Sequence, residues 1–463
     1  MLSFFAKYLK SFSYHKSFGT TYILSALVGL LPYSMVDVKD QPEKKSQEKI
    51  KTIFQFSFPL CFITILWAAG YITNYIWANQ GVLAIPTSRN YPIISIVGHL
   101  MHIYLGICIF ITSLIFTPYK IYRYNILAIH LLSLDRELTS ICGKPIDYRT
   151  TVVFQILFII GGGLLVLLAL IFDYLVFMEM YGNYMAIICF AYVYPYLCSG
   201  VIHLQFITII HSTLQRFKAI NVFLQHIADI NVPTSNAALQ SKLKSAQKEK
   251  PEKEIPSNEL PKSNTKPIFA GENALPANAH TRLNEIFILH DKLCDISEAI
   301  NDAFSPQIVS TITAGFIINI FGFFIETKVA FWAWGQNVTL ILIATSYVFW
   351  GAINALIIYI MLACTTNTRE TANAAALVVH KILQNKPAFM LNDEIYYNKM
   401  KSFTLQILHR KNTFHFNALG LFRLDYTFIF SAVSAATSYL IVLLQFDLTD
   451  YLVAFDTMLQ GSS

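Results

Sequence analysis

The sequence has few charged residues. Asp, Glu, Lys and Arg together make up 13% of its 463 residues, against roughly 25% in a typical soluble domain. Hydrophobic residues make up 55%, and the mean hydropathy is +0.49. So few charges do not cover the surface of a soluble protein of this length, and part of the surface must face lipid. The composition therefore argues against a cytosolic enzyme and against a nucleic-acid-binding protein.

Patterns of metal-binding or disulfide-forming residues are also missing. None of the seven cysteines forms a C-x-x-C pair, and most lie inside apolar runs, as small buried residues do. His99 and His102 have a helical i, i+3 spacing, but no third ligand follows at a suitable distance, so we interpret them as packing residues. We expect no enzymatic activity, no cofactor, no metal and no disulfide framework.

Seven apolar runs are long enough to cross a bilayer, which takes about 20 helical residues. Each contains few or no charges, and in lipid the backbone must bond to itself, so we expect helices. An earlier run from Tyr22 to Leu31 is too short to span, and we interpret it as an interfacial or re-entrant helix. The expected spans lie at 53–77, 93–116, 152–177, 185–212, 306–327, 338–362 and 424–446.

The basic residues indicate the orientation of these spans. If the N-terminus is cytoplasmic, 32 of the 34 Lys and Arg residues lie on the cytoplasmic side, and only Arg89 and Lys328 lie outside. This asymmetry predicts a cytoplasmic N-terminus and an extracellular C-terminus. Helical patterns also continue beyond spans two, four, five and six, so these helices should project into the cytoplasm. Within one extension, we interpret Asp135-Arg136-Glu137 as a charged helix face.

The last span carries a polar stripe. Its hydroxyl and amide side chains recur at intervals of 3, 4 and 7 residues, which places them on one face of a helix. Packing between helices uses Ser and Thr in this way, but a stripe along most of a span is also typical of a water-filled pore. A single helix cannot enclose a pore, so the second interpretation predicts a symmetric oligomer. The stripe contains Thr427, Ser431, Ser434, Ser438 and Gln445, with Ile441 as its apolar member.

The end of this span resembles the signature of insect gustatory receptors, which is Thr-Tyr, five hydrophobic residues and Gln-Phe. Tyr439, Gln445 and Phe446 match, and Ser438 replaces the Thr while keeping a hydroxyl. The segments from Tyr22 to Tyr33 and Gly420-Leu421-Phe422 are similar to the fructose-receptor branch of that family. The seven spans, the inside N-terminus and the long loop between spans four and five agree with this resemblance.

The resemblance implies an all-α membrane protein that forms a homotetramer around a central pore lined by the last helix. We then expect a cytoplasmic N-terminal segment at 1–51, spans one to four at 52–230, a disordered loop at 231–280, and spans five and six with their extension at 281–362. Cytoplasmic anchor helices should follow at 363–419, then the pore helix at 420–446 and an extracellular tail at 447–463.

The implied function is that of a ligand-gated, nonselective cation channel for Na⁺, K⁺ and Ca²⁺ in the plasma membrane of a sensory neuron. Its agonist would be a sugar, with D-fructose the expected one, and its other partners are membrane lipid and further copies of the chain. Two alternatives stay open: a G-protein-coupled receptor, which has the opposite orientation, and a secondary sugar transporter, which should contain broken helices or inverted repeats.

A sugar pocket needs polar side chains and aromatic planes, which the outer halves of spans two to six supply. Carboxylates within a membrane are candidates for function by default. The resemblance points most directly to Asp173, Glu326 and Trp350. The remaining candidates are Tyr347, Ser346, Thr327, Tyr192 and His99, followed by Thr339, Asn354 and Trp334.

We expect the gate at the outer end of the pore helix, where Ile441, Gln445 and Phe446 lie, because an apolar ring can close a pore by dewetting. The alternative for Phe446 is an aromatic residue at the lipid interface. Asp447 directly follows the signature, and four copies of its carboxylate would concentrate cations at the outer mouth.

Overall fold

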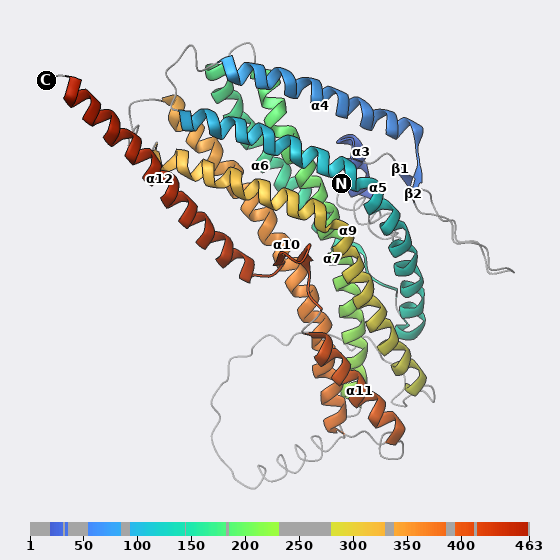
Figure 1. Ribbon diagram of the computed structural model, residues 1–463. Coiled ribbons are helices and arrows are strands. Elements are labelled where there is room, and N and C mark those ends of the chain that lie inside the picture. Colours follow the sequence, from blue (N-terminus) through green and yellow to red (C-terminus); the bar gives the residue numbers. More distant parts are fainter. Residues whose placement is uncertain are drawn as a thin grey trace, which may run out of the picture.

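The computed structural model describes residues 19–30, 33–35, 54–84, 93–143, 145–181, 185–230, 279–328, 338–385, 394–411 and 414–461. The described chain is almost entirely helical (Figure 1). Seven of its helices are long and apolar enough to cross a membrane, as the sequence predicted. These helices are α4 (Phe58–Ala84), α5 (Ile93–Cys142), α6 (Arg149–Tyr181), α7 (Met185–Ile230), α9 (Ala279–Lys328), α10 (Val338–Asn385) and α12 (Thr427–Gly461).

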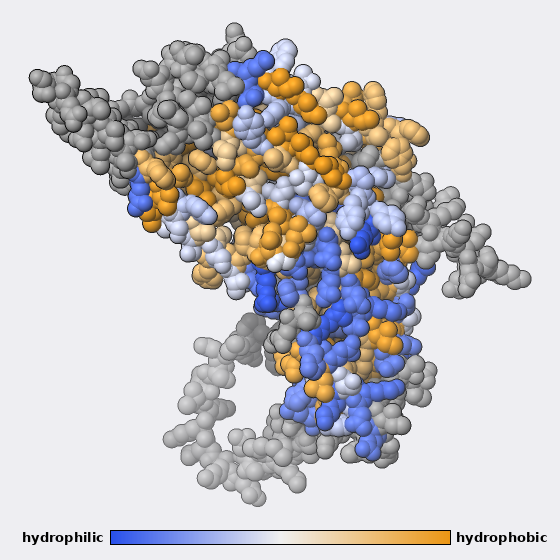
Figure 2. All heavy atoms as spheres, in the orientation of Figure 1, coloured by the Kyte–Doolittle hydropathy of each residue, from blue (hydrophilic) through white to orange (hydrophobic). Residues whose placement is uncertain are grey.

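Four of these helices are far longer than a membrane span. α5, α7, α9 and α10 contain 46 to 50 residues each, so each is about 70 Å or more in length. Their extensions gather at one end with α11 (Glu394–Lys411), in the lower part of Figure 1. On the face drawn in Figure 2, hydrophobic residues cover the upper part of the molecule and hydrophilic residues the lower part. The predicted extensions of spans two, four, five and six are therefore confirmed as helices.

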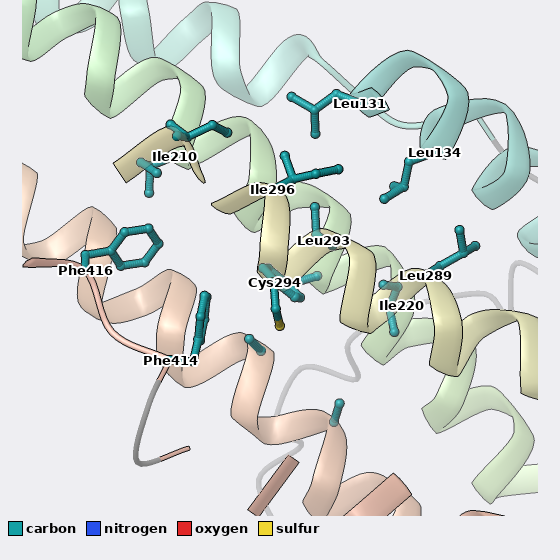
Figure 3. Close-up of a cluster of buried hydrophobic side chains, with 14 of the residues drawn as sticks. Leu131, Leu134, Ile210, Ile220, Leu289, Leu293, Cys294, Ile296, Phe414 and Phe416 are labelled. Atoms are coloured by element: carbon teal, nitrogen blue, oxygen red, sulfur yellow. The ribbon is translucent and has the colours of Figure 1, made fainter. Parts of the chain in front are cut away.

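We call this end the anchor bundle and define it as residues 127–142, 206–230, 279–312, 361–385 and 394–424. It contains a continuous core of buried apolar side chains from all five segments. Figure 3 shows part of it: Leu131 and Leu134 of α5 lie near Leu289, Leu293 and Ile296 of α9. This core is the largest cluster of buried apolar residues that the structure describes.

Two of the long helices contain a proline in their interior. α9 runs through Pro306 without a break, in agreement with the expected helical extension of span five before residue 306. α7 likewise contains Pro195, which has no N–H to offer the carbonyl of Ala191 one turn earlier. The Tyr71 hydroxyl of α4 donates a hydrogen bond to that carbonyl at 3.4 Å instead. A neighbouring helix thus satisfies the acceptor that the proline leaves free.

Two span boundaries differ from those expected. Span one begins at Phe58 rather than 53, because Phe54–Phe56 (β2) pairs with Tyr33–Met35 (β1) in an antiparallel pair. The last helix begins at Thr427 rather than 424. Asp425 ends the preceding turn, and its carboxylate accepts hydrogen bonds from the backbone N–H and the hydroxyl of Thr427.

The backbone of the turn before the last helix explains why a glycine occupies position 420. Asn417–Ala418 (β3) and Phe422–Arg423 (β4) form a short antiparallel pair. The two residues after β3, Leu419 and Gly420, have φ values of 51° and 73°. Glycine adopts this left-handed backbone region without steric cost. Gly420 therefore has a structural role in a tight turn, which is independent of its similarity to the fructose-receptor branch.

The short apolar N-terminal run forms α3 (Gly19–Leu27). Hydrogen bonds tie it to the membrane helices: Gln205 donates to Ser25 at 2.5 Å, and Thr20 donates to Gln155 at 2.5 Å. Tyr194 also donates to the Val28 carbonyl at 2.8 Å. The expectation of a short helix that does not span is confirmed, and the helix is docked on the bundle through polar contacts.

Inside the anchor bundle, the prediction that Asp135 belongs to a charged helix face is wrong. The Asp135 carboxylate faces inward and accepts two hydrogen bonds from Arg216 of α7, at 2.7 and 2.8 Å. The next two residues, Arg136 and Glu137, are exposed as expected.

Other expected segments lie outside the described residues, namely the N-terminal 1–18 and nearly all of the loop at 231–280. The expected tail at 447–463 continues α12 as helix as far as Gly461.

Candidate functional site

Three of the predicted ligand residues come together between α6 and α10. Asp173 of α6 is buried, with 4% of its surface exposed. Its Oδ1 accepts a hydrogen bond from the Ser346 hydroxyl, and its Oδ2 accepts one from Trp350 Nε1 at 2.9 Å. Ser346 and Trp350 lie one helical turn apart, so α10 presents both on the same face. We call Asp173, Ser346, Trp350 and Tyr196 the Asp173 cluster.

Tyr196 of α7 is the member of this cluster that the sequence did not predict. Its ring stacks on Trp350, with the ring centroids 4.6 Å apart and the planes at 22°. The predicted residue Tyr192 lies one turn earlier on α7, and the His102 ring contacts both tyrosines, at 4.1 and 5.3 Å between centroids. The i, i+4 spacing of the two tyrosines was the signal that could have identified Tyr196.

Tyr347 and Asn354 have different surroundings from their neighbours on α10. Tyr347 packs against Gly322 of α9, where a Cβ atom would lie only 3.0 Å from Tyr347 Cδ1. Asn354 donates a hydrogen bond to the carbonyl of Trp350 at 3.1 Å. The predicted polar face of span six is thus divided, since part of it contacts α6 and part contacts α9.

Two other predicted ligand residues, Glu326 and Thr327, do not join the Asp173 cluster. Glu326 and Thr327 are half-buried at the end of α9, and the Thr327 hydroxyl donates to the Phe323 carbonyl of its own helix at 2.7 Å. The side chains of His99 and Thr339, and the whole of Trp334, lie outside the described residues. The structure therefore brings together Asp173, Ser346 and Trp350 but leaves Glu326 apart from them.

The polar stripe of α12 faces away from its own subunit. All six residues predicted to line the pore or form the gate are exposed: Ser431, Ser434, Ser438, Ile441, Gln445 and Phe446. In Figure 1 this helix lies along one side of the molecule, and none of its membrane segment is buried. The Asp447 side chain lies outside the described residues. A helix whose polar face is uncovered in one subunit has that face available to other copies.

The opposite face of α12 links it to the ligand region. Leu440, Leu443 and Leu444 pack against an apolar cluster that includes Tyr192 of α7 and Phe324 of α9. Tyr347 packs against the same cluster. Helix α9 therefore contacts α10 through Gly322, and its Phe324 belongs to the apolar cluster on which α12 packs. Gly322 and Phe324 lie on one turn of α9, and Tyr347, which contacts Gly322, directly follows Ser346 of the Asp173 cluster.

An open polar cavity of about 710 Å³ lies in the anchor bundle and does not belong to this site. It is bordered by α9, α11 and β3, and its lining includes Glu298, Asp302 and Arg410. Asp302 and Gly322 are twenty residues apart on α9, so the cavity is about 30 Å from the ligand region. Arg410 also forms ion pairs with Asp291 and Asp295 of α9, which attaches α11 to the bundle.

Comparison with known families gives a match to nearly the whole chain. Residues 18–450 match the model of the 7tm chemosensory receptors. The matched segment includes α3, six of the long helices, α12 as far as residue 450 and both groups of site residues described above. Among the residues that the structure describes, no group of three His, Cys, Asp or Glu side chains is placed to hold a metal ion.

Several Drosophila melanogaster receptors are similar in sequence to this chain. The chain is 50% identical over 171 residues to gustatory and pheromone receptor 33a, and this match covers 37% of the chain but only 36% of that protein. It is 25% identical over 317 residues to putative gustatory receptor 28a, covering 67% of each. It is 24% identical over 200 residues to the gustatory receptor for bitter taste 66a, covering 40% of the chain and 34% of that protein.

The fold is similar to that of a solved receptor. The olfactory receptor OR5 from Machilis hrabei, in complex with eugenol, superposes with a TM-score of 0.58 and covers 93% of this chain and 98% of its own. Its sequence identity is 11%, so the likeness concerns the fold alone.

Proposed function

Because this chain belongs to the 7tm chemosensory receptor family, we propose that it is a ligand-gated, nonselective cation channel that acts as a taste receptor. Family membership makes it a multi-pass membrane receptor of sensory neurons rather than an enzyme. It also disfavours the two alternatives, a G-protein-coupled receptor and a sugar transporter. The observation that carries the channel proposal is the exposed polar stripe of α12.

In this proposal four copies place their α12 helices around a central axis. The hydroxyls of Ser431 and Ser438 donate to carbonyls one turn earlier, at 3.3 and 3.0 Å. In lipid their lone pairs would still lack donors, whereas water in a pore solvates them. Ser431, Ser434 and Ser438 then line the pore, and Ile441, Gln445 and Phe446 form the gate at its outer end. The apolar face with Leu440, Leu443 and Leu444 keeps each helix attached to its own subunit.

The orientation in the proposal rests on charge. Only two of the 34 Lys and Arg residues lie on the side that we place outside, and basic residues favour the cytoplasmic side. The anchor bundle is then cytoplasmic, and the Asp173 cluster lies in the outer half of the membrane. The Asp173 cluster is the ligand site of the proposal, because it is the place where the structure joins a membrane carboxylate to aromatic rings.

Two ligand classes are candidates for this site. D-fructose follows from the resemblance of the N-terminal segment and Gly420-Leu421-Phe422 to the fructose-receptor branch, and Asp173, Ser346 and Trp350 offer polar and aromatic groups for a sugar. The second class comprises bitter compounds and pheromones. It is favoured by the 50% identity to gustatory and pheromone receptor 33a and by the match to a receptor for bitter taste.

The test is expression of this chain alone in a cell without other taste receptors, with whole-cell current recorded during application of D-fructose, glucose, sucrose and a panel of bitter compounds. A channel gives rapid, nonselective cation current that needs no added G protein. Trp350→Ala should abolish the ligand response while tetramers still form, since the resemblance to gustatory receptors implies that the anchor bundle holds the subunits together. Currents that depend on a G protein, or that track substrate uptake, would contradict the proposal.

A further inference from the structure

The carboxylate of Asp173 is buried, and the part of the chain that the structure describes gives it no positive partner. It accepts one hydrogen bond at each oxygen, from Ser346 and from Trp350 Nε1, and both donors are neutral groups. Among the residues that the structure describes, no Lys, Arg or His lies within ion-pair distance of it. By contrast, Asp135, Asp291, Asp295 and Asp425 all have an arginine partner.

An uncompensated buried carboxylate favours a cationic ligand over a neutral one. A charge in a low-dielectric site is costly until an opposite charge compensates it. A neutral sugar offers hydrogen bonds but leaves the negative charge uncompensated, whereas a cation compensates it directly. A carboxylate has about four lone-pair positions, and Ser346 and Trp350 occupy two, so Asp173 can accept further N–H or C–H donors from a ligand.

The aromatic residues around Asp173 also favour a cationic ligand. Tyr196 and Trp350 form a stacked pair at the carboxylate, and Tyr192 lies one turn before Tyr196 on α7. The faces of Trp and Tyr rings carry negative electrostatic potential and attract ammonium groups, with Trp the strongest. Carboxylate and aromatic faces together are the groups that recognise an alkylated ammonium, which has an apolar surface and a positive charge.

We propose that the Asp173 cluster binds a small organic cation, an alkylated or aromatic ammonium compound, in preference to a neutral sugar. This inference rests on the proposed function, because it names the ligand class of that same site. Asp173 supplies the compensating charge, and Trp350 and Tyr196 supply ring faces for the alkyl groups. D-fructose would then be a weak ligand.

The test uses two probes of the same shape that differ in charge: benzyltrimethylammonium and its neutral carbon isostere, 2,2-dimethylpropylbenzene. Their binding to the purified full-length chain is measured by the ligand-induced rise in thermal unfolding temperature. We expect the ammonium to bind about tenfold or more tightly than the isostere. Equal binding of the two probes by the wild-type chain would overturn the proposal, and so would tighter binding of D-fructose than of the ammonium.

Variants locate the preference within the protein. Asp173→Asn should remove the difference between the two probes, and Asp173→Glu should keep part of it. Asp147→Asn is the matched control, because Asp147 is an exposed carboxylate with 64% of its side chain accessible, and the preference should be unchanged. An ammonium preference that persists in Asp173→Asn would place the cation elsewhere, for instance in the pore, and would also contradict the proposal. If Asp173→Asn does not fold, Trp350→Phe retains the carboxylate and an aromatic face and should retain the preference.

Failure of this inference is distinct from failure of the proposed function. If the chain carries agonist-gated current but binds both probes equally, the channel proposal stands and the ligand class is wrong. If the chain binds the ammonium at Asp173 but never conducts, the ligand class stands and the channel proposal is wrong.

Discussion

Arg216 and Asp135 form a two-point ion pair in which the guanidinium is fully buried. Nε and Nη2 of Arg216 donate to the two carboxylate oxygens at 2.7 and 2.8 Å. The Arg216 side chain is 0% exposed and that of Asp135 14%, and Tyr148 also donates to Asp135. The third nitrogen, Nη1, donates to the carbonyl and the hydroxyl of Ser212 at 2.9 and 2.6 Å. This pair fixes α7 to α5 within the anchor bundle.

Replacing Arg216 by Met should therefore destabilise the protein strongly. The substitution leaves Asp135 as an uncompensated charge in a largely buried site, which costs about 3–5 kcal/mol. Thermal unfolding of the purified protein measures the loss. The matched control is Arg136→Met, because Arg136 is exposed and its loss should change stability by less than about 0.5 kcal/mol. The double variant Arg216→Met with Asp135→Leu should recover much of the stability, and equal losses in both arginine variants would refute this assignment.

A cysteine at Ser438 should react from the pore. Ser438 is exposed on the polar stripe, whereas Ala436, about half a helical turn away, is half-buried against its own subunit. A cationic methanethiosulfonate reagent should block current through the Ser438→Cys channel and leave Ala436→Cys channels like the wild type. Block of both variants, or of neither, would argue that the stripe does not line a water-filled path.

Gln445→Ala should alter single-channel conductance or leak current at unchanged surface expression.

Neutralising Asp447 should lower cation conductance at low salt. Four carboxylates at the outer mouth raise the local cation concentration, and screening removes this effect as the Debye length falls from about 30 Å at 0.01 M to about 3 Å at 1 M. The single-channel conductance of Asp447→Asn should thus fall below that of the wild type in dilute salt and approach it in concentrated salt. A conductance that matches the wild type at every salt concentration would place Asp447 away from the ion path.

An extra methyl group at Gly322 should disturb the contact between α9 and α10. The new Cβ would lie 3.0 Å from Tyr347 Cδ1 and 3.3 Å from Tyr347 Cβ, and overpacking of this kind costs about 1–3 kcal/mol. Because Phe324, on the same turn of α9, belongs to the apolar cluster on which α12 packs, we expect Gly322→Ala to change the open probability without agonist. Single-channel recording checks this.

The control for Gly322 lies on the same helix. At Gly315 the nearest atom to a new Cβ is 3.9 Å away, at Asn354, so Gly315→Ala should be neutral or slightly stabilising, since Ala favours a helix interior over Gly by about 1 kcal/mol. Adding Tyr347→Ala to Gly322→Ala should relieve the clash. Gating that is unchanged in Gly322→Ala would show that this contact does not link the two helices functionally.

The helices were predictable because they depend on local sequence. Long apolar runs and the 3.6-residue period identified the spans and their extensions, and the exposed face of α12 followed from the spacing of its hydroxyls. Pro306 lies inside α9. A proline removes a helical hydrogen bond, but packing of α9 on its neighbours outweighs that loss, and the local sequence does not reveal this packing.

Contacts between distant residues were not predictable in the same way. Asp135 appeared to belong to an exposed charged face because its partner Arg216 lies 81 positions further along the chain. Tyr196 was missed since its contact with Trp350 depends on how α7 and α10 are placed. Asp173 was identified because a carboxylate in an apolar run is unusual by itself, but the sequence did not reveal that Ser346 and Trp350, the two donors that the structure describes for it, are neutral.

The length of α9 has a mechanical consequence. One unbroken helix of 50 residues connects the anchor bundle with the turn that carries Gly322 and Phe324, so it behaves as a lever whose fulcrum lies in the anchor. With an arm of about 30 Å, set by 1.5 Å per residue over twenty residues, a tilt of only about 2° moves the far end by about 1 Å. A ligand that shifts this far end by about 1 Å therefore needs no unfolding, hinge or broken helix to displace α12. In the proposed tetramer, the rigidity of the anchor bundle would then determine how much of that displacement reaches the neighbouring copies.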